Sequence, residues 1–266
     1  MNVSRELVVR GVRAVRRSAI WWSVGIVTFI VVNLAFWPSL EGSEALEGFE
    51  DMADFMEAIG AQNIATPSGY VDGQVYALLL PLLLSALAIT LASGLTAGDE
   101  NTGRLELLHA LPVGRRQVWL SRWTATMIVL AAVAAVGGLS TLVSLPLFSL
   151  DEVSSGRVVM ATIGCVLLAA FHGSISYVAA AFGGSRGLSA GAGIVVLVVG
   201  YIMSFVLPLA DALSRARDLS PWYWALGDQP VTYGIDVWRL GLTAALTAFL
   251  VAIGTWAIER RDIHTA

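Results

Sequence analysis

A charged segment between two long uncharged runs constrains this chain more than any other feature. Residues 74–98 and 123–148 contain no charged side chain, and each run exceeds the about 20 apolar residues that a helix needs to cross a bilayer. The segment between them, Asp99–Arg122, carries many charges and has leucines at helical spacing. We therefore expect two membrane-spanning helices, joined at one membrane face by a short amphipathic helix that is exposed to an aqueous partner.

The composition extends this conclusion to the whole chain. Hydrophobic residues make up 56% of the sequence and charged residues 14%, which is too little charge to cover a soluble globule. The apolar runs lack the polar face of a soluble bundle helix. Six spans are predicted, at residues 19–37, 74–98, 123–148, 157–182, 188–209 and 240–258. The predicted fold is an all-α integral membrane protein with one transmembrane domain over residues 1–266. An N-terminal amphipathic interfacial helix over residues 3–17 and a re-entrant segment within 210–238 are further options.

Arginine predicts the orientation, because all 16 basic residues are arginine. Six spans return both termini to the same side. Twelve arginines fall on that side: Arg5, Arg10, Arg13, Arg16, Arg17, Arg104, Arg115, Arg116, Arg122, Arg186, Arg260 and Arg261. The other four are Arg157, Arg215, Arg217 and Arg239. The positive-inside rule then predicts a multi-pass protein of the cell membrane with both termini in the cytoplasm.

The tryptophans agree with this arrangement, because interfaces are where tryptophan concentrates. The inner interface is expected to hold Trp21, Trp22, Trp119, Trp123 and Trp256. The outer interface is expected to hold Trp37, Trp222, Trp224 and Trp238. No tryptophan is expected in the middle of a span.

Several chemistries are absent from the sequence. Without lysine the chain has no phosphate-binding GxxxxGK[ST] loop. Its three histidines, at 109, 172 and 264, are too scattered for a metal site. The arginines flank the spans, which insertion already explains, so nucleic-acid binding is unsupported. The outer loop 38–73 is acidic, and its role stays open.

Two alternatives to a transport subunit remain at this point. His172, Ser174 and Ser176 share the fourth span, which allows an integral membrane enzyme or lipid-modifying protein. The favoured interpretation of this histidine is a hydrogen bond that joins two helices. An ATP-independent channel or carrier is the second alternative, although ion-coupled carriers and proton pumps keep charged residues within their spans. Here the interiors of the predicted spans contain no charged residue, and Arg157 stands at the very start of the fourth.

The segment between the second and third spans resembles a known family. The pattern E-x-x-T-G-x-L-E-x-L-x-x-L-P-V-x-R-R is similar to the corresponding loop of ABC-2 type permeases, the membrane subunits of ATP-binding cassette exporters. It is spelled by Glu100, Thr102, Gly103, Leu105, Glu106, Leu108, Leu111, Pro112, Val113, Arg115 and Arg116. The six-span layout and the terminal Glu259–Ile263 agree with the family. The resemblance covers essentially the whole chain, and this loop is its sharp motif.

The resemblance implies a permease subunit without catalytic residues, cofactor or metal of its own. The loop would be a coupling helix on a separate ATPase subunit, which would hold ATP and Mg²⁺. Its contacts would be Leu105, Leu108 and Leu111, with Arg104, Arg115 and Arg116 at the rim. Two copies, or one copy and a related permease, would enclose an export pathway for an amphipathic or hydrophobic substrate near the second and fifth spans. Ser85, Thr90, Tyr201 and Ser204 are the candidate lining residues.

The arginine asymmetry predicts the result of a labelling experiment. In a background without Cys165, Glu47→Cys should react with an impermeant maleimide in sealed cells, whereas Arg115→Cys should react only after the cells are opened. Labelling of position 115 in sealed cells would contradict the predicted orientation.

Overall fold

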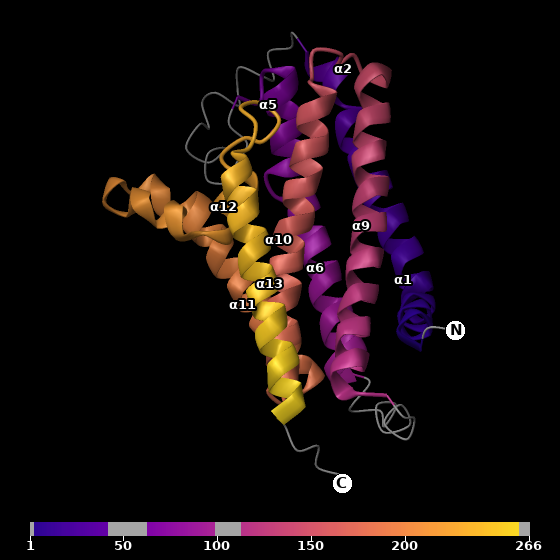
Figure 1. Cartoon of the computed structure of the whole chain (residues 1–266). Helices are drawn as coiled ribbons and strands as arrows, with labels where there is room; N and C mark the ends of the chain where they lie inside the picture. Colours follow the sequence, from indigo (N-terminus) through magenta and orange to yellow (C-terminus); the bar gives the residue numbers. More distant parts are fainter. Residues whose placement is uncertain (1–2, 42–62, 99–112, 261–266) are drawn as a thin grey trace.

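The computed structural model describes residues 3–41, 63–98 and 113–260, and the regular structure of these residues is entirely helical (Figure 1). Six helical stretches are long and apolar enough to cross a membrane. They are Ser4–Leu40, Pro67–Gly98, Arg115–Leu147, Ser155–Ala181, Arg186–Leu209 and Val237–Arg260. The predicted all-α class and the six predicted spans are confirmed, although each of these helical stretches is longer than the corresponding apolar run.

In the described residues, the first three spans are built from seven helical pieces. Helix α1 (Val3–Leu34) and the short α2 (Trp37–Leu40) form the first. The second contains α5 (Pro67–Val71), the π-helix η1 (Asp72–Tyr76), α6 (Leu79–Ser93) and the π-helix η2 (Gly94–Gly98), and the third is α9 (Arg115–Leu147).

The remaining spans follow with one irregular excursion. The fourth is α10 (Ser155–Ala181). The fifth starts as α11 (Arg186–Tyr201) and continues as η3 (Ile202–Val206) and η4 (Leu207–Leu209). The excursion contains η5 (Asp211–Leu219) and α12 (Pro221–Leu226), and the sixth span is α13 (Val237–Arg260).

Helix α10 occupies the centre of the bundle. It packs against α6, α9, α11 and α13, while α1 packs along α9 (Figure 1). The approach of α9 to α10 depends on Gly138, because a Cβ atom there would lie 2.9 Å from the Thr162 hydroxyl. Close packing through small residues is how helices associate in lipid, where the hydrophobic effect does not drive them together.

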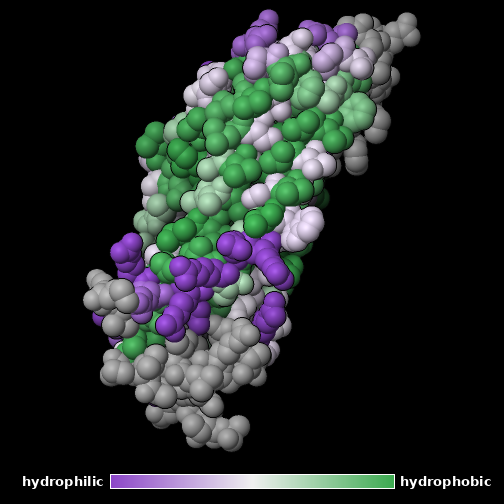
Figure 2. Space-filling view, turned by 90° about the vertical axis from the view of Figure 1, so that its right-hand side faces the viewer, coloured by the Kyte–Doolittle hydropathy of each residue, from purple (hydrophilic) through white to green (hydrophobic). Residues whose placement is uncertain are grey.

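The outer surface of the bundle is an apolar belt. Figure 2 shows this belt on the face that carries α1 and α9, with hydrophilic residues gathered towards its ends. Large hydrophobic side chains remain exposed on several spans, among them Val143, Val195 and Phe249. A soluble monomer rarely exposes contiguous apolar surface of this extent, so the belt agrees with a membrane-embedded chain.

The predicted interfacial helix over residues 3–17 is helical but continues without a break into the first span. Its residues pack on the start of α9: Leu7 and Val118 are buried together, and the Gln117 amide donates a hydrogen bond to Ser4 Oγ at 2.6 Å. Residues 3–17 are therefore the first part of α1, which packs on α9, and they do not form a helix separate from the first span.

The second span is interrupted near its N-terminal end. Residues 77 and 78 separate η1 from α6, and Leu78 has a φ of −131°. Pro81 explains the interruption, because proline has no N–H to donate to the carbonyl four residues earlier, which is that of Ala77. The sequence predicted one continuous span here.

The fifth span ends its regular helix early. After Tyr201 the chain passes through η3 and η4, and in Figure 1 the orange residues between α11 and α12 project sideways from the bundle. Helix α12 then returns to pack beside α10. A Cβ atom on Gly164 would lie 2.4 Å from the Ala225 carbonyl oxygen. Because Gly164 lies well inside α10, α12 packs within the bundle; it belongs to the stretch for which the sequence predicts a re-entrant segment, and that segment stays a prediction.

A buried carboxylate fixes the segment that follows α12. Asp72, the first residue of η1, is fully buried. It accepts hydrogen bonds from the backbone N–H of Val231 at 2.9 Å, from that of Thr232 at 2.8 Å and from the Thr232 hydroxyl at 2.8 Å. The Arg157 guanidinium donates to the carbonyls of Val231 and Thr232. We call Asp72, Arg157, Val231 and Thr232 the outer clamp, because they tie the second and fourth spans to the segment after α12.

The outer clamp generates a stability prediction. Asp72→Asn removes the charge and turns one acceptor into a donor that faces other donors, so we expect a loss of about 2 kcal/mol in the free energy of unfolding. Thermal unfolding of the purified protein measures the loss. Asp228→Asn is the matched control, because Asp228 forms an exposed ion pair with Arg217 at 2.9 Å and such pairs contribute about 1 kcal/mol or less. Equal losses of stability for the two substitutions would show that the outer clamp contributes no more than an exposed ion pair.

Candidate functional site

A buried polar pair joins the second and fourth spans. Ser85 on α6 and His172 on α10 are both fully buried, and Ser85 Oγ lies 3.0 Å from His172 Nδ1. Gly173 beside the histidine brings the helices together, because its Cβ position would lie 3.1 Å from Ala88 Cβ. The interpretation of His172 as a hydrogen-bonding link between helices is therefore confirmed.

Aromatic rings surround this pair on the side of the fifth span. The Trp222 ring of α12 lies 6.4 Å from the His172 ring, 5.4 Å from Tyr201 and 6.2 Å from Phe205, measured between centroids. Trp222 is 1% exposed. The sequence placed this tryptophan at the outer interface, whereas the structure places it beside a residue in the interior of α10. The difference arises because α12 folds back into the bundle, which a hydropathy pattern does not reveal.

A chain of hydroxyl groups holds α12 against α11. Ser204 Oγ donates to Ser220 Oγ at 2.8 Å, and Ser220 Oγ donates to the Gly200 carbonyl at 2.6 Å. The same Ser220 oxygen accepts the Trp222 backbone N–H at 3.2 Å and so caps the start of α12. Ser220 is fully buried. Sequence reasoning did not select it, although serine followed by proline is a recognisable helix start.

Three of the four predicted lining residues are thus brought together. Ser85, Tyr201 and Ser204 lie around Trp222 and His172, and we call these five residues with Ser220 the central cluster. Thr90 is not part of it. This residue is exposed, and five residues beyond Ser85 a helix has turned through about 140°.

The central cluster holds polar atoms that lack partners. In the part of the chain that the structure describes, His172 Nε2, Trp222 Nε1 and the nearby Ser176 Oγ are buried without a hydrogen-bond partner. Such a group costs about 1–3 kcal/mol when it is buried unpaired. These atoms can bind a polar group if the contact between α12 and α10 opens.

The three residues on which the enzyme alternative depends, His172, Ser174 and Ser176, are not joined to one another by hydrogen bonds in the structure. Ser174 Oγ donates to the Phe171 carbonyl at 2.7 Å, and the partner of His172 is Ser85, not Ser174 or Ser176. Among residues 3–41, 63–98 and 113–260, no group of three His, Cys, Asp or Glu residues is placed to hold a metal ion.

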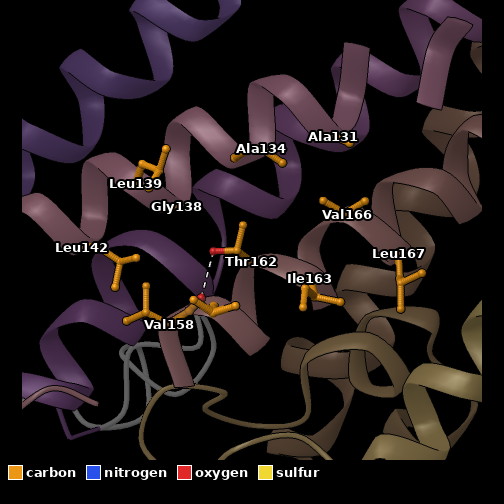
Figure 3. Close-up of a pocket in the computed structure, with 12 residues that line it drawn as sticks. Ala131, Ala134, Gly138, Leu139, Leu142, Val158, Thr162, Ile163, Val166 and Leu167 are labelled. Carbon is orange, nitrogen blue, oxygen red and sulfur yellow. Dashed lines mark hydrogen bonds between the residues drawn. The ribbon is translucent and has the colours of Figure 1, made fainter. Parts of the chain in front are cut away.

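A separate apolar groove lies between α9 and α10. It has a volume of about 490 Å³, and Figure 3 shows alanines and Gly138 of α9 facing larger aliphatic side chains of α10. Its lining is Ala131, Ala134, Ala135, Gly138, Leu139, Leu142, Val158, Val159, Thr162, Ile163, Val166 and Leu167. The Thr162 hydroxyl is already used, because it donates to the Val158 carbonyl at 2.8 Å and lies 3.0 Å from the Tyr76 hydroxyl. The groove therefore offers space to an apolar chain but no polar group to orient it.

The predicted ATPase contact falls mainly outside the described residues. The members that lie outside are Glu100, Thr102, Gly103, Arg104, Leu105, Glu106, Leu108, Leu111 and Pro112. Arg115 and Arg116 are the first two residues of α9. The described elements on either side of this segment are η2, which ends at Gly98, and α9, which begins at Arg115 (Figure 1).

Comparison with protein-family models places this chain in a family. A family model described as "Multidrug efflux system permease Rv1217c, C-terminal domain" matches residues 11–258, from the first span to the last. No curated protein sequence matches the chain.

The contribution of the hydrogen bond between Ser85 and His172 can be measured as a change in stability. Ser85→Ala leaves His172 Nδ1 without its partner, so we expect a loss of about 1 kcal/mol in the free energy of unfolding, the usual range for a hydrogen bond between membrane helices. Thr90→Ala, on the exposed side of α6, should change stability by about 0.5 kcal/mol or less. In a His172→Phe background the effect of Ser85→Ala should shrink, since the interaction is already gone. An unchanged effect there would show that the two side chains are not coupled.

Proposed function

Since the chain belongs to the family of the multidrug efflux system permease Rv1217c, we propose that it is the membrane-spanning permease subunit of an ATP-driven exporter. The sequence has no lysine and hence no phosphate-binding loop of the GxxxxGK[ST] type. The energy would therefore come from a separate ATPase subunit that binds ATP and Mg²⁺. The chain itself would carry the cargo pathway and the contact with that subunit.

The observation that carries this proposal is the motif between the second and third spans. Leu105, Leu108 and Leu111 recur at the spacing of one helical face. An amphipathic helix of this kind binds by laying its apolar face into a groove of the partner. Arg104 and Arg115 would pair with acidic groups at the rim of that groove.

The position of the motif supports a mechanical role. It connects η2, the end of the second span, with α9, the third span. Closure of the ATPase pair on ATP would shift this segment, and both spans would follow because they are covalently continuous with it. Helix α6 contacts α10 and α11, so the displacement would reach the central cluster.

The central cluster is the proposed pathway. Its rings and unpartnered polar atoms suit a hydrophobic or amphipathic cargo, which needs apolar contact and a few hydrogen bonds. The fifth span lies at the surface of this chain: Val195, Val198 and Val199 are exposed along α11. A second copy, or a related permease, placed against this face would enclose the pathway between two chains.

The sharpest test is Leu108→Asp. If Leu108 is buried in the groove of the ATPase, the substitution places an unpaired carboxylate in an apolar contact, at a cost of several kcal/mol. We expect the partner ATPase to stop co-purifying with the variant, and transport to be lost. Membrane insertion should survive, because the segment does not enter lipid.

His109→Asp is the matched control, because it adds the same group one residue away, off the leucine stripe. It should leave assembly and transport close to wild type. A Leu108→Asp complex that assembles and exports normally would remove the main support for the proposal.

A further inference from the structure

A second groove lies between α9 and α13, at the end of the bundle where both termini lie. It has a volume of about 360 Å³, and its walls include Arg116 and Leu120 of α9 and Ala248, Ala252, Trp256 and Glu259 of α13. The residues from α13 recur every three or four positions, so they form one face of that helix. This groove shares no residue with the central cluster.

The groove is polar at one end and apolar along the rest. Arg116 is the second residue of α9, and Glu259 is the penultimate residue of α13. From Glu259 to Ala248 the helix rises by about 16 Å, which is roughly half the thickness of the hydrocarbon core. The small side chains of Ala248 and Ala252 leave a shallow floor beside Leu120. An occupant therefore needs a short charged end and a long apolar part.

The two charges at the polar end are not used by the protein. Within residues 3–41, 63–98 and 113–260, neither Arg116 nor Glu259 has a hydrogen bond or ion pair from its side chain. Trp256 is 50% exposed beside them, and the Arg260 guanidinium lies 4.5 Å from its ring centre. Tryptophan and arginine in this arrangement are typical of the level at which lipid head groups lie.

We propose that this groove binds one phospholipid, and that the lipid is a phosphatidylethanolamine. Arginine binds phosphate oxygens through paired N–H donors, so Arg116 holds the phosphate. The Glu259 carboxylate repels a phosphate but accepts hydrogen bonds from a primary ammonium group. A phosphatidylethanolamine head group carries both charges and satisfies both side chains, while an acyl chain lies along Leu120, Ala248 and Ala252.

The charges also say which lipids fit less well. Phosphatidylglycerol offers Glu259 an uncharged diol, so the carboxylate gains no counter-charge. The trimethylammonium group of phosphatidylcholine has no N–H to donate to it. The resemblance implies that Arg116 contacts the ATPase. The lipid assignment replaces that contact, because the same guanidinium would bind the lipid phosphate.

The test is competition between three lipids with identical acyl chains. The purified full-length chain is mixed with equal amounts of phosphatidylethanolamine, phosphatidylglycerol and phosphatidylcholine, and the retained lipid is counted by native mass spectrometry. We expect phosphatidylethanolamine to be preferred by up to about fivefold, the largest ratio usual for one exposed charge contact. Equal retention of all three lipids overturns the proposal.

Variants separate the two ends of the lipid. Glu259→Gln should abolish the preference for phosphatidylethanolamine over phosphatidylglycerol, and Arg116→Gln should lower the retention of both. Ala252→Phe should block the apolar floor and lower retention of every phospholipid, whereas Leu242→Phe, at an exposed position on a different face of the same helix, should not. A preference that survives Glu259→Gln, or retention that survives Ala252→Phe, contradicts the assignment. These measurements need no ATPase, so their outcome does not depend on the proposed export function.

Discussion

Two glycines on the central helix α10 determine how the rest of the bundle is arranged. Gly164 and Gly173 of α10 present bare backbone to α12 and α6, whose atoms approach to within 2.4 and 3.1 Å of the positions that Cβ atoms would occupy. Larger residues there would push both neighbours away. Because lipid supplies no hydrophobic force between helices, this close contact is the main attraction available, and the hydrogen bonds of the bundle form around it.

Two of these hydrogen-bonded groups act at different depths. The outer clamp at Asp72 ties the segment after α12 to the second and fourth spans. Deeper in the bundle, Ser85 pairs with His172 while Ser220 holds α11 and α12 together. The clamp satisfies its carboxylate with three donors, whereas the central cluster leaves polar atoms unpaired. The hydrogen bonds of the outer clamp are therefore complete. In the central cluster, by contrast, a ligand or a movement of the helices can add hydrogen bonds to the unpaired atoms.

The sequence predicted the spans well and their ends less well. Hydropathy identifies the stretch that lies in lipid, but a helix continues as long as its backbone hydrogen bonds are favourable. Helix α9 therefore starts at Arg115, eight residues before the predicted span. The interruption of the second span could have been predicted from Pro81. Proline has no N–H, so the Ala77 carbonyl lacks the donor that it would have in a continuous helix. The early end of α11 has no comparably clear signal, since Ile202–Val206 is as apolar as the helix before it.

The candidate site shows the same division. The sequence alone determined that the chain crosses the membrane, that it lacks a lysine-bearing phosphate loop, and that a leucine-striped helix pattern separates its second and third spans. Each of these depends on residue type and spacing along one stretch of chain. Only the tertiary structure decided that Trp222 lies beside His172, that Ser220 bridges two segments, and that Asp72 meets Val231. These contacts join residues far apart in the sequence. They depend on how closely backbones approach in three dimensions, and hydrophobic periodicity carries no information about that distance.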